Sequence, residues 1–268
     1  MESRKIVLIT GANSGIGYEA VKAFLQSTKP YHILFGARSL EKAQIAVDDL
    51  KKEVPESKNT IETLEVDLVS DGSIEKAFET VKEKHGKVDA LVNNAGATFD
   101  IAYINGKGTL RECFNNAYDV NVAGTHVLTA TFIPLLIKSQ DPRLVFVTGL
   151  SAINQASKQY FPTPPQPAGW PKKIEFETIG YRCSKTALNM LMLDWNHKLK
   201  ADGVKVWAVG PGMCATNLGG LGSEFAYKMG CEHPSRGGLI IRSVVEGERD
   251  EDVGKIVGKD GVVDWRGG

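Results

Sequence analysis

The stretch IVLITGANSGIG, at residues 6–17, joins a short apolar run to a glycine-rich turn. Residues 6–9 are apolar and mostly β-branched, which is typical of a strand buried on both faces of a parallel sheet. Glycines after such a strand let the backbone approach a pyrophosphate, and the start of the next helix offers unpaired N–H groups. The stretch therefore predicts the phosphate loop of a dinucleotide-binding fold. A glycine-rich turn that binds no ligand is the alternative.

Outward from this stretch, strand-like and helix-like segments alternate along the chain. This order predicts parallel strands joined by right-handed crossovers, with helices on both faces of the sheet. The predicted fold class is α/β, a single-domain, doubly wound, Rossmann-like parallel sheet of about seven strands that takes up residues 1–268. Strands are expected at residues 6–9, 33–37, 60–66, 90–92, 144–148, 204–209 and, in the tail, 261–265; helices are expected at 18–26, 40–53, 73–84, 110–137 and 180–200.

Composition argues against a nucleic-acid-binding or membrane protein and against a metal site on the cysteines. The 268 residues include 32 basic and 32 acidic side chains, so no basic excess points to nucleic acid or to an acidic membrane surface. No apolar run is long enough to span a bilayer, and the first residues lack the pattern of a signal peptide. The cysteines at positions 113, 183, 214 and 231 have no metal-like spacing. We therefore expect a cytoplasmic protein with reduced thiols, no bound metal and no membrane partner.

The end of the second expected strand carries the residue that selects the dinucleotide. An acidic residue about twenty positions after the phosphate loop would bind the adenosine ribose hydroxyls. Ala37 stands at that place here, and Arg38 follows it. An arginine suits the 2′-phosphate of NADP, which a carboxylate would repel. The sequence therefore predicts NADP(H) as cofactor; a solvated Arg38 that pairs with Glu41 is the alternative.

The helix expected from residue 180 carries Tyr181 and Lys185, which lie one turn apart on one face. A tyrosine is a poor acid–base group at neutral pH because its pKa is near ~10. A neighbouring ammonium favours the phenolate and would lower that pKa by roughly 1–3 units. The pair could then exchange a proton with a carbonyl or alcohol oxygen. Taken alone, Tyr-x3-Lys is a weak signal, because many surface helices contain it by chance.

Together these motifs resemble the short-chain dehydrogenase/reductase family, and the carbonyl-reductase-like, NADP-dependent members in particular. The loop has the family's Thr-Gly-x3-Gly-x-Gly spacing at residues 10–17, and residues 93–96 read Asn-Asn-Ala-Gly. Residues 211–216 resemble the family's Pro-Gly-x3-Thr. Asn121 matches the helix asparagine that supports a water-linked proton relay to the lysine; a buried asparagine bonded to its own helix is the alternative.

The resemblance implies a set of site residues in this chain. The implied catalytic residues are Asn121, Ser151, Tyr181 and Lys185. The implied cofactor contacts are Gly11, Asn13, Ser14, Gly15, Ile16, Gly17, Arg38, Asp67, Leu68, Asn94, Ala95, Gly96, Tyr181, Lys185, Pro211, Gly212, Cys214 and Thr216. A homodimer or homotetramer that packs through the helices at 110–137 and 180–200 is implied as well.

One position departs from the family pattern. The family places a serine after the fifth strand, where it hydrogen-bonds the substrate oxygen, and this chain has Gly149 there. Ser151 is the favoured substitute, because a glycine at 149 would permit an unusual turn that re-aims the hydroxyl. Thr148 is the second candidate. The third alternative is that no hydroxyl serves at this place.

Three segments are expected at the carboxyl edge of the sheet, where ligands of open α/β sheets bind. These substrate-side insertions are residues 97–109, the proline-rich 152–178 and the glycine-rich 217–232. Aromatic residues in the second segment favour a medium-to-large, uncharged carbonyl substrate, and a metabolite of secondary metabolism is the expected kind. The predicted function is NADPH-dependent carbonyl reduction, reversibly alcohol oxidation. The alternative is an NADP-binding member with altered or lost redox chemistry, as a sensor, a scaffold or a non-redox enzyme.

Overall fold

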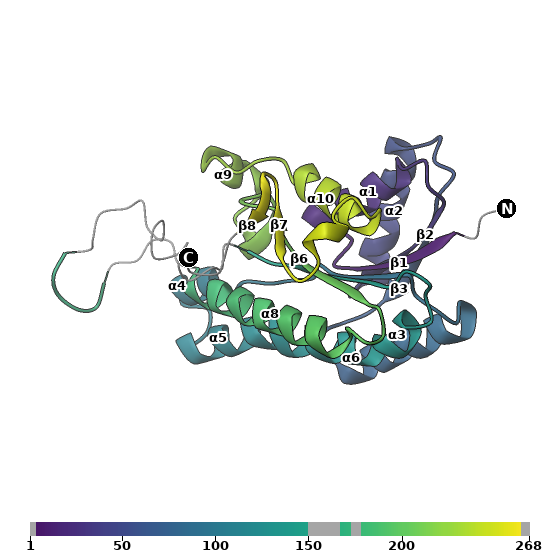
Figure 1. The fold of residues 1–268 in the computed structure, drawn as a ribbon. Helices are drawn as coiled ribbons and strands as arrows, with labels where there is room; N and C mark the ends of the chain where they lie inside the picture. Colours follow the sequence, from purple (N-terminus) through teal and green to yellow (C-terminus); the bar gives the residue numbers. More distant parts are fainter. Residues whose placement is uncertain (1–3, 150–166, 173–177, 264–268) are drawn as a thin grey trace.

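A mostly parallel sheet forms the centre of the molecule (Figure 1). The computed structural model describes residues 4–149, 167–172 and 178–263. Within these residues the strands are β1 (Lys5–Thr10), β2 (Tyr31–Ala37), β3 (Thr60–Glu65), β4 (Ala90–Asn93), β5 (Arg143–Val147), β6 (Lys205–Gly210), β7 (Ile256–Gly258) and β8 (Gly261–Val263). Their order is β3-β2-β1-β4-β5-β6-β7-β8, and only the β7–β8 pair is antiparallel.

Helices cover both faces of this sheet, as predicted. Side chains alternate along β1, so that Val7 and Ile9 pack towards one helix layer while Ile6 and Leu8 pack towards the other. The first layer contains α1 (Gly15–Leu25), α2 (Leu40–Glu53) and α10 (Ser235–Val245). The second contains α3 (Asp71–Lys84), α6 (Thr125–Leu136) and α8 (Ile179–Lys198), on the lower side in Figure 1. The central strands β1, β4 and β5 are therefore buried on both sides, whereas the edge strand β3 is only partly buried.

The sequence prediction needs three corrections. The described sheet has eight strands, because the three-residue β7 was not predicted and the tail strand β8 pairs with it in antiparallel fashion. Helix α10 was not predicted either. The long helix expected at 110–137 is divided into α5 (Leu110–Tyr118), a π-helical segment (Asp119–Gly124) and α6. A side chain at Gly124 would overlap the Leu68 carbonyl, so this helical path runs very close to the loop after β3.

Two smaller helices, α4 (Asp100–Ile104) and α9 (Ser223–Lys228), lie in segments that follow the carboxyl ends of β4 and β6. Short 3-10 turns lie at Leu218–Gly220 and Asp250–Asp252. Among the described residues, no helix has the length and apolar character that crossing a membrane requires. The four cysteines, Cys113, Cys183, Cys214 and Cys231, are free thiols in this structure. Strand order reverses between β1 and its neighbours β2 and β4, and this is the place where ligands of doubly wound sheets bind.

Candidate active site

The glycine-rich loop fits tightly between two other loops at the carboxyl edge. Gly11 has a φ of +62°, and a Cβ there would lie 2.9 Å from Ala95 Cα. Gly15 has a φ of +56°, and a Cβ there would lie 2.9 Å from Thr216 Cγ2. Only glycine combines this backbone conformation with this close approach. The loop therefore brings together three of the predicted motifs, from residues 11–17, 94–96 and 211–216.

The start of α1 is open to an anionic ligand. Its N-cap, Ser14, makes no side-chain hydrogen bond to the first turn, and that turn contains no acidic residue. In contrast, Ser39 caps α2 by accepting from Lys42 N, and Ser70 caps α3 by accepting from Ser73 N. Free amides at a helix start carry partial positive charge. The geometry around Asn13, Ser14, Gly15 and Ile16 thus fits a phosphate-bearing cofactor.

A hydrogen-bond cluster that sequence reasoning missed holds the loop against β4. The Thr10 hydroxyl accepts from the backbone N–H groups of Asn94 and Ala95, each at 3.0 Å. The Asn94 amide donates to the Thr10 carbonyl at 2.8 Å and to the Gly11 carbonyl at 3.2 Å. The side chain of Asn94 therefore holds the loop in place. Thr10 is the first residue of the Thr-Gly-x3-Gly-x-Gly pattern, but nothing in the sequence indicated these hydrogen bonds.

The residues predicted near the adenosine lie at the ends of β2 and β3. Arg38 is exposed directly after β2, and in the described part of the chain its guanidinium makes no ion pair, with Glu41 or any other acid. Asp67 lies after β3, where its N–H donates to Ser73 Oγ at 3.0 Å. Leu68 is buried against Gly124. Arg38 is therefore available to a ligand, whereas Leu68 supports the helical path.

Tyr181 and Lys185 lie on one face of α8, beside the carboxyl end of β5. Lys185 is 3% exposed, and its Nζ donates to the Val147 carbonyl at 2.8 Å and lies 5.7 Å from the centre of the Tyr181 ring. Burial lowers the pKa of Lys185 to about 8. Burial also raises the pKa of Tyr181 to about 12, so the predicted lowering of this pKa by the ammonium is wrong. The phenol is protonated at neutral pH and can donate a proton.

Asn121 connects the loop after β4 with α8. Its side chain lies in the π-helical segment, is fully buried, donates to Ser184 Oγ at 2.8 Å and exchanges two 2.8 Å hydrogen bonds with the Ala97 backbone. The alternative of an asparagine bonded to its own helix is therefore wrong. A Cβ on Gly96 would lie 3.1 Å from Lys185 Nζ and 3.3 Å from Asn121 Oδ1. Gly96 thus keeps open the place where the lysine and the asparagine converge.

The loop after β6 reaches the same site. Gly212 has a φ of +78°, which lets the chain turn back over the phosphate loop. Arg236 of α10, which the sequence did not suggest, donates two hydrogen bonds to the Pro211 carbonyl, at 3.0 and 2.7 Å. Burial raises the pKa of the Cys214 thiol, so it is neutral and adds no charge near Tyr181. The Pro-Gly turn is therefore held by a cation from α10.

Comparison with known proteins agrees with this geometry. The family model for short chain dehydrogenases matches residues 5–160. The chain is 47% identical over 268 residues to short-chain dehydrogenase/reductase tropE of Talaromyces stipitatus, with 98% of each chain covered. It is 43% identical to short-chain dehydrogenase/reductase eupG of a Phoma species, covering 92% of this chain and 91% of that protein. The chain belongs to the short-chain dehydrogenase/reductase family. It is accordingly an oxidoreductase.

Solved structures of other dehydrogenases and reductases share the fold. The NADPH-bound carbonyl reductase from chicken fatty liver matches with a TM-score of 0.76 at 22% identity, covering 98% of this chain and 99% of that one. A 3-oxoacyl-[acyl-carrier protein] reductase from Brucella melitensis in complex with NAD matches with a TM-score of 0.74 at 19% identity, covering 97% and 96%. The first of these structures holds NADPH and the second NAD, and at these identities the likeness shows the fold alone.

The departure at Gly149 lies directly opposite the tyrosine of this short-chain dehydrogenase/reductase. A Cβ at Gly149 would lie 3.8 Å from Tyr181 Cε1, an ordinary van der Waals contact, and the glycine does not have a positive φ. The turn predicted at Gly149 depends on residues 150 and 151, which lie outside the described residues. The Thr148 hydroxyl is buried and donates to the Lys185 carbonyl at 3.2 Å, so it supports α8. Ser151 lies outside the described residues.

An aspartate on the substrate side holds the start of α8 in this short-chain dehydrogenase/reductase. The buried Asp100 carboxylate accepts from the N–H groups of Gly180, at 2.8 Å, and Tyr181, at 3.0 Å. It also accepts from the Thr98 hydroxyl at 2.8 Å. A carboxylate at a helix start is favourable because it satisfies free amides and meets the positive end of the helix dipole. No sequence pattern links positions 100 and 180, so this cap could not be predicted.

Two of the three substrate-side segments meet in the fold. A Cβ on Gly219 would lie 3.1 Å from Thr98 Cγ2 and 3.6 Å from Ile101 Cγ1, so residues 97–109 and 217–232 are in contact. Of the segment 152–178, only residues 167–172 and 178 are described. Large apolar side chains are exposed in these segments or just before them, namely Tyr103, Trp170, Met213, Leu218, Leu221, Phe225, Tyr227 and Met229. The substrate side thus offers an apolar surface.

Proposed function

We propose that the protein is an NADPH-dependent carbonyl reductase, and that it oxidises the corresponding alcohol in the reverse direction. The observation that carries the proposal is the protonated Tyr181 on one helical face with Lys185, next to an open phosphate loop. When bound, the reduced nicotinamide would supply a hydride to the carbonyl carbon. Tyr181 would donate its phenolic proton to the carbonyl oxygen, so the C=O group becomes CH–OH.

The proton lost by Tyr181 must be replaced before the next turnover. The ammonium of Lys185 would stabilise the phenolate by its charge, which counts for more in a buried site than in water. Asn121 borders the Gly96 gap that Lys185 also borders, and there it would hold a water-linked path for the returning proton. The residues that would contact the cofactor are the set implied by the family resemblance, from Gly11 to Thr216, with Thr10 as their support.

Arg38 supports NADP(H) over NAD(H). Its guanidinium is exposed at the carboxyl end of β2, without an ion-pair partner in the described residues. No carboxylate stands at Ala37 to bind ribose hydroxyls. A 2′-phosphate at this place would accept a bidentate, charge-assisted pair of hydrogen bonds from the Arg38 guanidinium.

For the substrate, we infer a medium-to-large, uncharged ketone of the kind made in secondary metabolism. The exposed apolar side chains of the two contacting substrate-side segments support this class. A second candidate function is supported by Gly149, which offers no hydroxyl opposite Tyr181. In that case the protein would bind NADP as a sensor, a scaffold or an enzyme of different chemistry.

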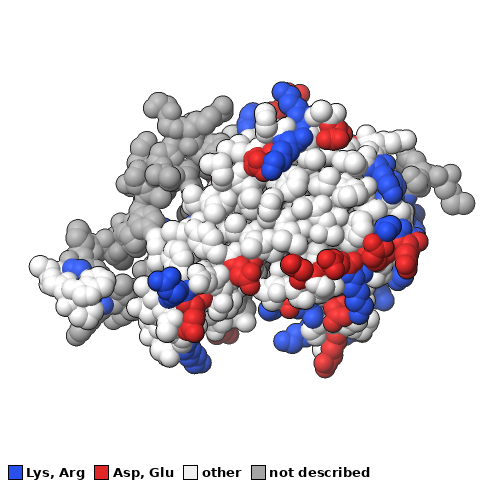
Figure 2. All heavy atoms as spheres, turned by 90° about the horizontal axis from the view of Figure 1, so that it is seen from below, with Lys and Arg blue, Asp and Glu red and all other residues white. Residues whose placement is uncertain are grey.

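We further propose a cytoplasmic homodimer or homotetramer. Figure 2 shows few charged side chains over the middle of the face that carries α5, α6 and α8. Helix α6 contains no charged residue, and Leu110 of α5 and Met190 of α8 are exposed. An apolar face of this kind is suited to pack against a second copy.

One experiment tests the reductase proposal. Purified protein is mixed with NADPH and a panel of aromatic and cyclic ketones, and the loss of NADPH absorbance is followed. We expect turnover of the larger ketones, and a drop of about 10³-fold in kcat for Tyr181→Phe with unchanged NADPH affinity. The control is Tyr118→Phe, which removes a phenol at the end of α5 and keeps the ring that stacks on Phe114.

Two outcomes would contradict the proposal. Tight NADPH binding without turnover of any ketone would favour the sensor or scaffold function. Equal turnover by Tyr181→Phe and the native protein would remove Tyr181 from the proton transfer.

A further inference from the structure

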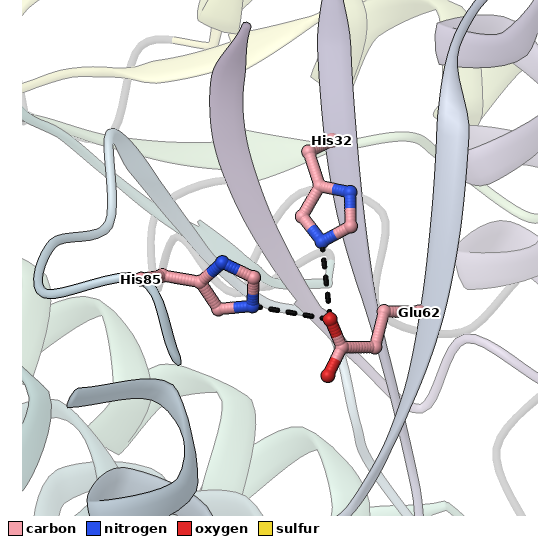
Figure 3. Close-up of side chains that lie close together, drawn as sticks. All are labelled: His32, Glu62 and His85. Atoms are coloured by element: carbon pink, nitrogen blue, oxygen red, sulfur yellow. Dashed lines mark hydrogen bonds and ion pairs between the residues drawn. The ribbon is translucent and has the colours of Figure 1, made fainter. Parts of the chain in front are cut away.

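A cluster of two histidines and a glutamate lies at the opposite end of β2 from Arg38 (Figure 3). His32 is the second residue of β2, Glu62 lies on the edge strand β3, and His85 directly follows α3. Both imidazoles direct Nε2 at the same carboxylate oxygen, Glu62 Oε2, at 3.3 Å from His32 and 3.1 Å from His85. Three side chains from three elements therefore converge on one point.

These separations suit the edges of a small coordination tetrahedron. Zinc binds histidine nitrogen at about 2.0–2.1 Å and carboxylate oxygen at about 2.0–2.2 Å, so neighbouring ligand atoms lie about 3.3 Å apart. The two nitrogen–oxygen separations have this length, and all three ligand atoms lie within 4.8 Å of one another. Small rotations of the two imidazoles would bring the nitrogens to the same spacing. The set, His2Glu, is one that zinc sites use with a water as fourth ligand.

The groups around the cluster orient its ligand atoms. His32 Nδ1 lies 2.8 Å from Thr60 Oγ1, so the hydroxyl holds the far side of this ring while Nε2 faces the cluster. Lys84 Nζ donates to Glu62 Oε1 at 2.7 Å, so Oε2 is the carboxylate oxygen that faces the two imidazoles. Metal-binding imidazoles and carboxylates usually have such outer partners.

The type of ligand atom in the cluster decides which metal ion it suits. Glu62 supplies one negative charge, while Lys84 and Arg4 supply positive charges nearby. Calcium and magnesium need several oxygen ligands, which this cluster does not offer. Imidazole-rich sets favour zinc and its neighbours in the first transition row. The side chains of His32, His85 and Glu62 are 21%, 16% and 26% exposed, so an ion can reach them from solvent.

We propose that His32, Glu62 and His85 bind one Zn²⁺ ion that fastens the edge strand β3 to β2 and to the end of α3. The site lies at the amino end of the strands, so its occupancy is independent of the proposed reaction at Tyr181. Positions 32, 62 and 85 are 30 and 23 residues apart, and no metal motif has that spacing. The sequence therefore predicted no metal, and only the fold brings these ligands together.

The test uses the full-length protein after treatment with EDTA. Co²⁺ is titrated in as a coloured substitute for Zn²⁺, its visible absorption is followed, and Zn²⁺ is then added to displace it. We expect one tetrahedral Co²⁺ per chain, displaced by one Zn²⁺, together with a higher melting temperature in Zn²⁺ and unchanged NADPH binding. Glu62→Gln and His85→Gln should each weaken binding more than about tenfold, and Thr60→Val about tenfold.

Two controls locate the ion. His197→Ala removes an exposed histidine at the end of α8 and should leave binding unchanged. The absence of a sulfur-to-cobalt charge-transfer band excludes the four cysteines as ligands. Full-strength binding in both Glu62→Gln and His85→Gln would overturn the proposal, and so would the absence of tetrahedral Co²⁺ absorption at millimolar metal. The trio would then be a hydrogen-bonded cluster that joins β2, β3 and α3 without an ion.

Discussion

The two ends of the parallel strands differ in whether their polar groups have hydrogen-bond or ion-pair partners within the protein. At the amino end, Asp141 accepts from Lys5, Arg143 and Lys205, and Arg143 also pairs with Asp250 at 2.6 Å. At the carboxyl end, the amides that begin α1 have no side-chain cap, and Arg38 has no acid partner among the described residues. The difference indicates that one end stabilises the sheet, while the other keeps its polar groups available for ligands.

The pKa shifts follow the same division. Burial alone would raise the pKa of Asp141, but hydrogen bonds from Arg143, Lys5 and Lys205 outweigh it and hold that pKa well below its usual range. A hydrogen bond from Arg143 also lowers the pKa of Asp250. At the carboxyl end, burial moves Tyr181 and Lys185 towards their neutral forms. At neutral pH the buried charge of Lys185 therefore costs stability, whereas Tyr181 is neutral in both the folded and the unfolded chain.

The largest expected effect on stability comes from removing Arg143 from the ion-pair network at the amino end of the strands. Arg143 has only 4% of its side chain exposed, so Arg143→Met leaves Asp141 and Asp250 without their buried partner. We expect the free energy of unfolding at pH 7 to fall by about 3 kcal/mol, measured by urea denaturation. Lys5→Met removes an exposed partner of Asp141 and should cost less than about 1 kcal/mol.

The pH dependence gives a second readout of the same variant. Because the folded protein depresses the pKa of Asp141 and Asp250, their stabilisation is present above the ordinary aspartate pKa of about 4 and is lost as the pH falls below it. Arg143→Met should therefore lose less stability on acidification than the native protein does. An equal loss in both proteins would contradict the assignment.

A substitution at the carboxyl end of the strands should change the preference between NADPH and NADH and leave the free energy of unfolding unaffected. Arg38→Asp places a carboxylate where the 2′-phosphate is proposed to bind. We expect the ratio of kcat/KM for NADPH to that for NADH to fall about 100-fold, with no loss of unfolding free energy. Lys51→Asp, the same charge change on the exposed last turn of α2, is the control. An unchanged ratio in Arg38→Asp would show that Arg38 does not contact the phosphate.

A smaller effect tests what faces Tyr181. Ser151→Ala removes the hydroxyl that the sequence favours as the substitute for the family serine. Adding Gly149→Ser restores a hydroxyl at a position whose Cβ would lie 3.8 Å from the tyrosine ring. We expect the double variant to turn over ketones about tenfold faster than Ser151→Ala alone. If Ser151→Ala has native kcat and Gly149→Ser adds nothing, no hydroxyl is used at this place.

The sequence predicted those strands and helices whose own residues show the pattern of that element. The apolar strand at residues 6–9, the glycines of the loop and the helix over residues 40–53 needed no tertiary information. Strand β7 has three residues, too few for any periodicity to show, and exists because it pairs with Ala208–Gly210 of β6. The π-helical segment ends at Gly124, which packs closely against Leu68, and the two residues are 56 positions apart.

The candidate site was predictable only where residue type and spacing carry the chemistry. The motif residues from Gly11 to Thr216 gather at one edge because that edge holds the carboxyl ends of the strands. The Asp100 cap and the Arg236 bonds to Pro211 depend on tertiary placement and have no local signal. The predicted pKa of Tyr181 had the wrong direction because burial, which the spacing to Lys185 cannot reveal, dominates it.

The smallest expected effect concerns Lys185, the buried cation of the functional end. Its pKa is about 8 in the folded chain against an ordinary 10.5, so below pH 8 the folded protein carries the full cost of a buried charge. That cost declines as the pH rises from 8 to 10.5. Lys185→Met removes the charge but leaves the Val147 carbonyl without its donor. We therefore expect the variant to be more stable than the native protein by about 1 kcal/mol at pH 7.

Denaturation at several pH values measures this gain and its direction. The advantage of Lys185→Met should shrink above pH 8, because the native lysine then becomes neutral, and NADPH-dependent turnover should be lost at every pH. Lys198→Met, which removes an exposed lysine of the same helix, should change the stability by less than about 0.5 kcal/mol at any pH. If the variant is less stable than the native protein at pH 7, then Lys185 stabilises the fold. The proposed difference between a stabilising amino end and a costly carboxyl end would then not hold for this residue.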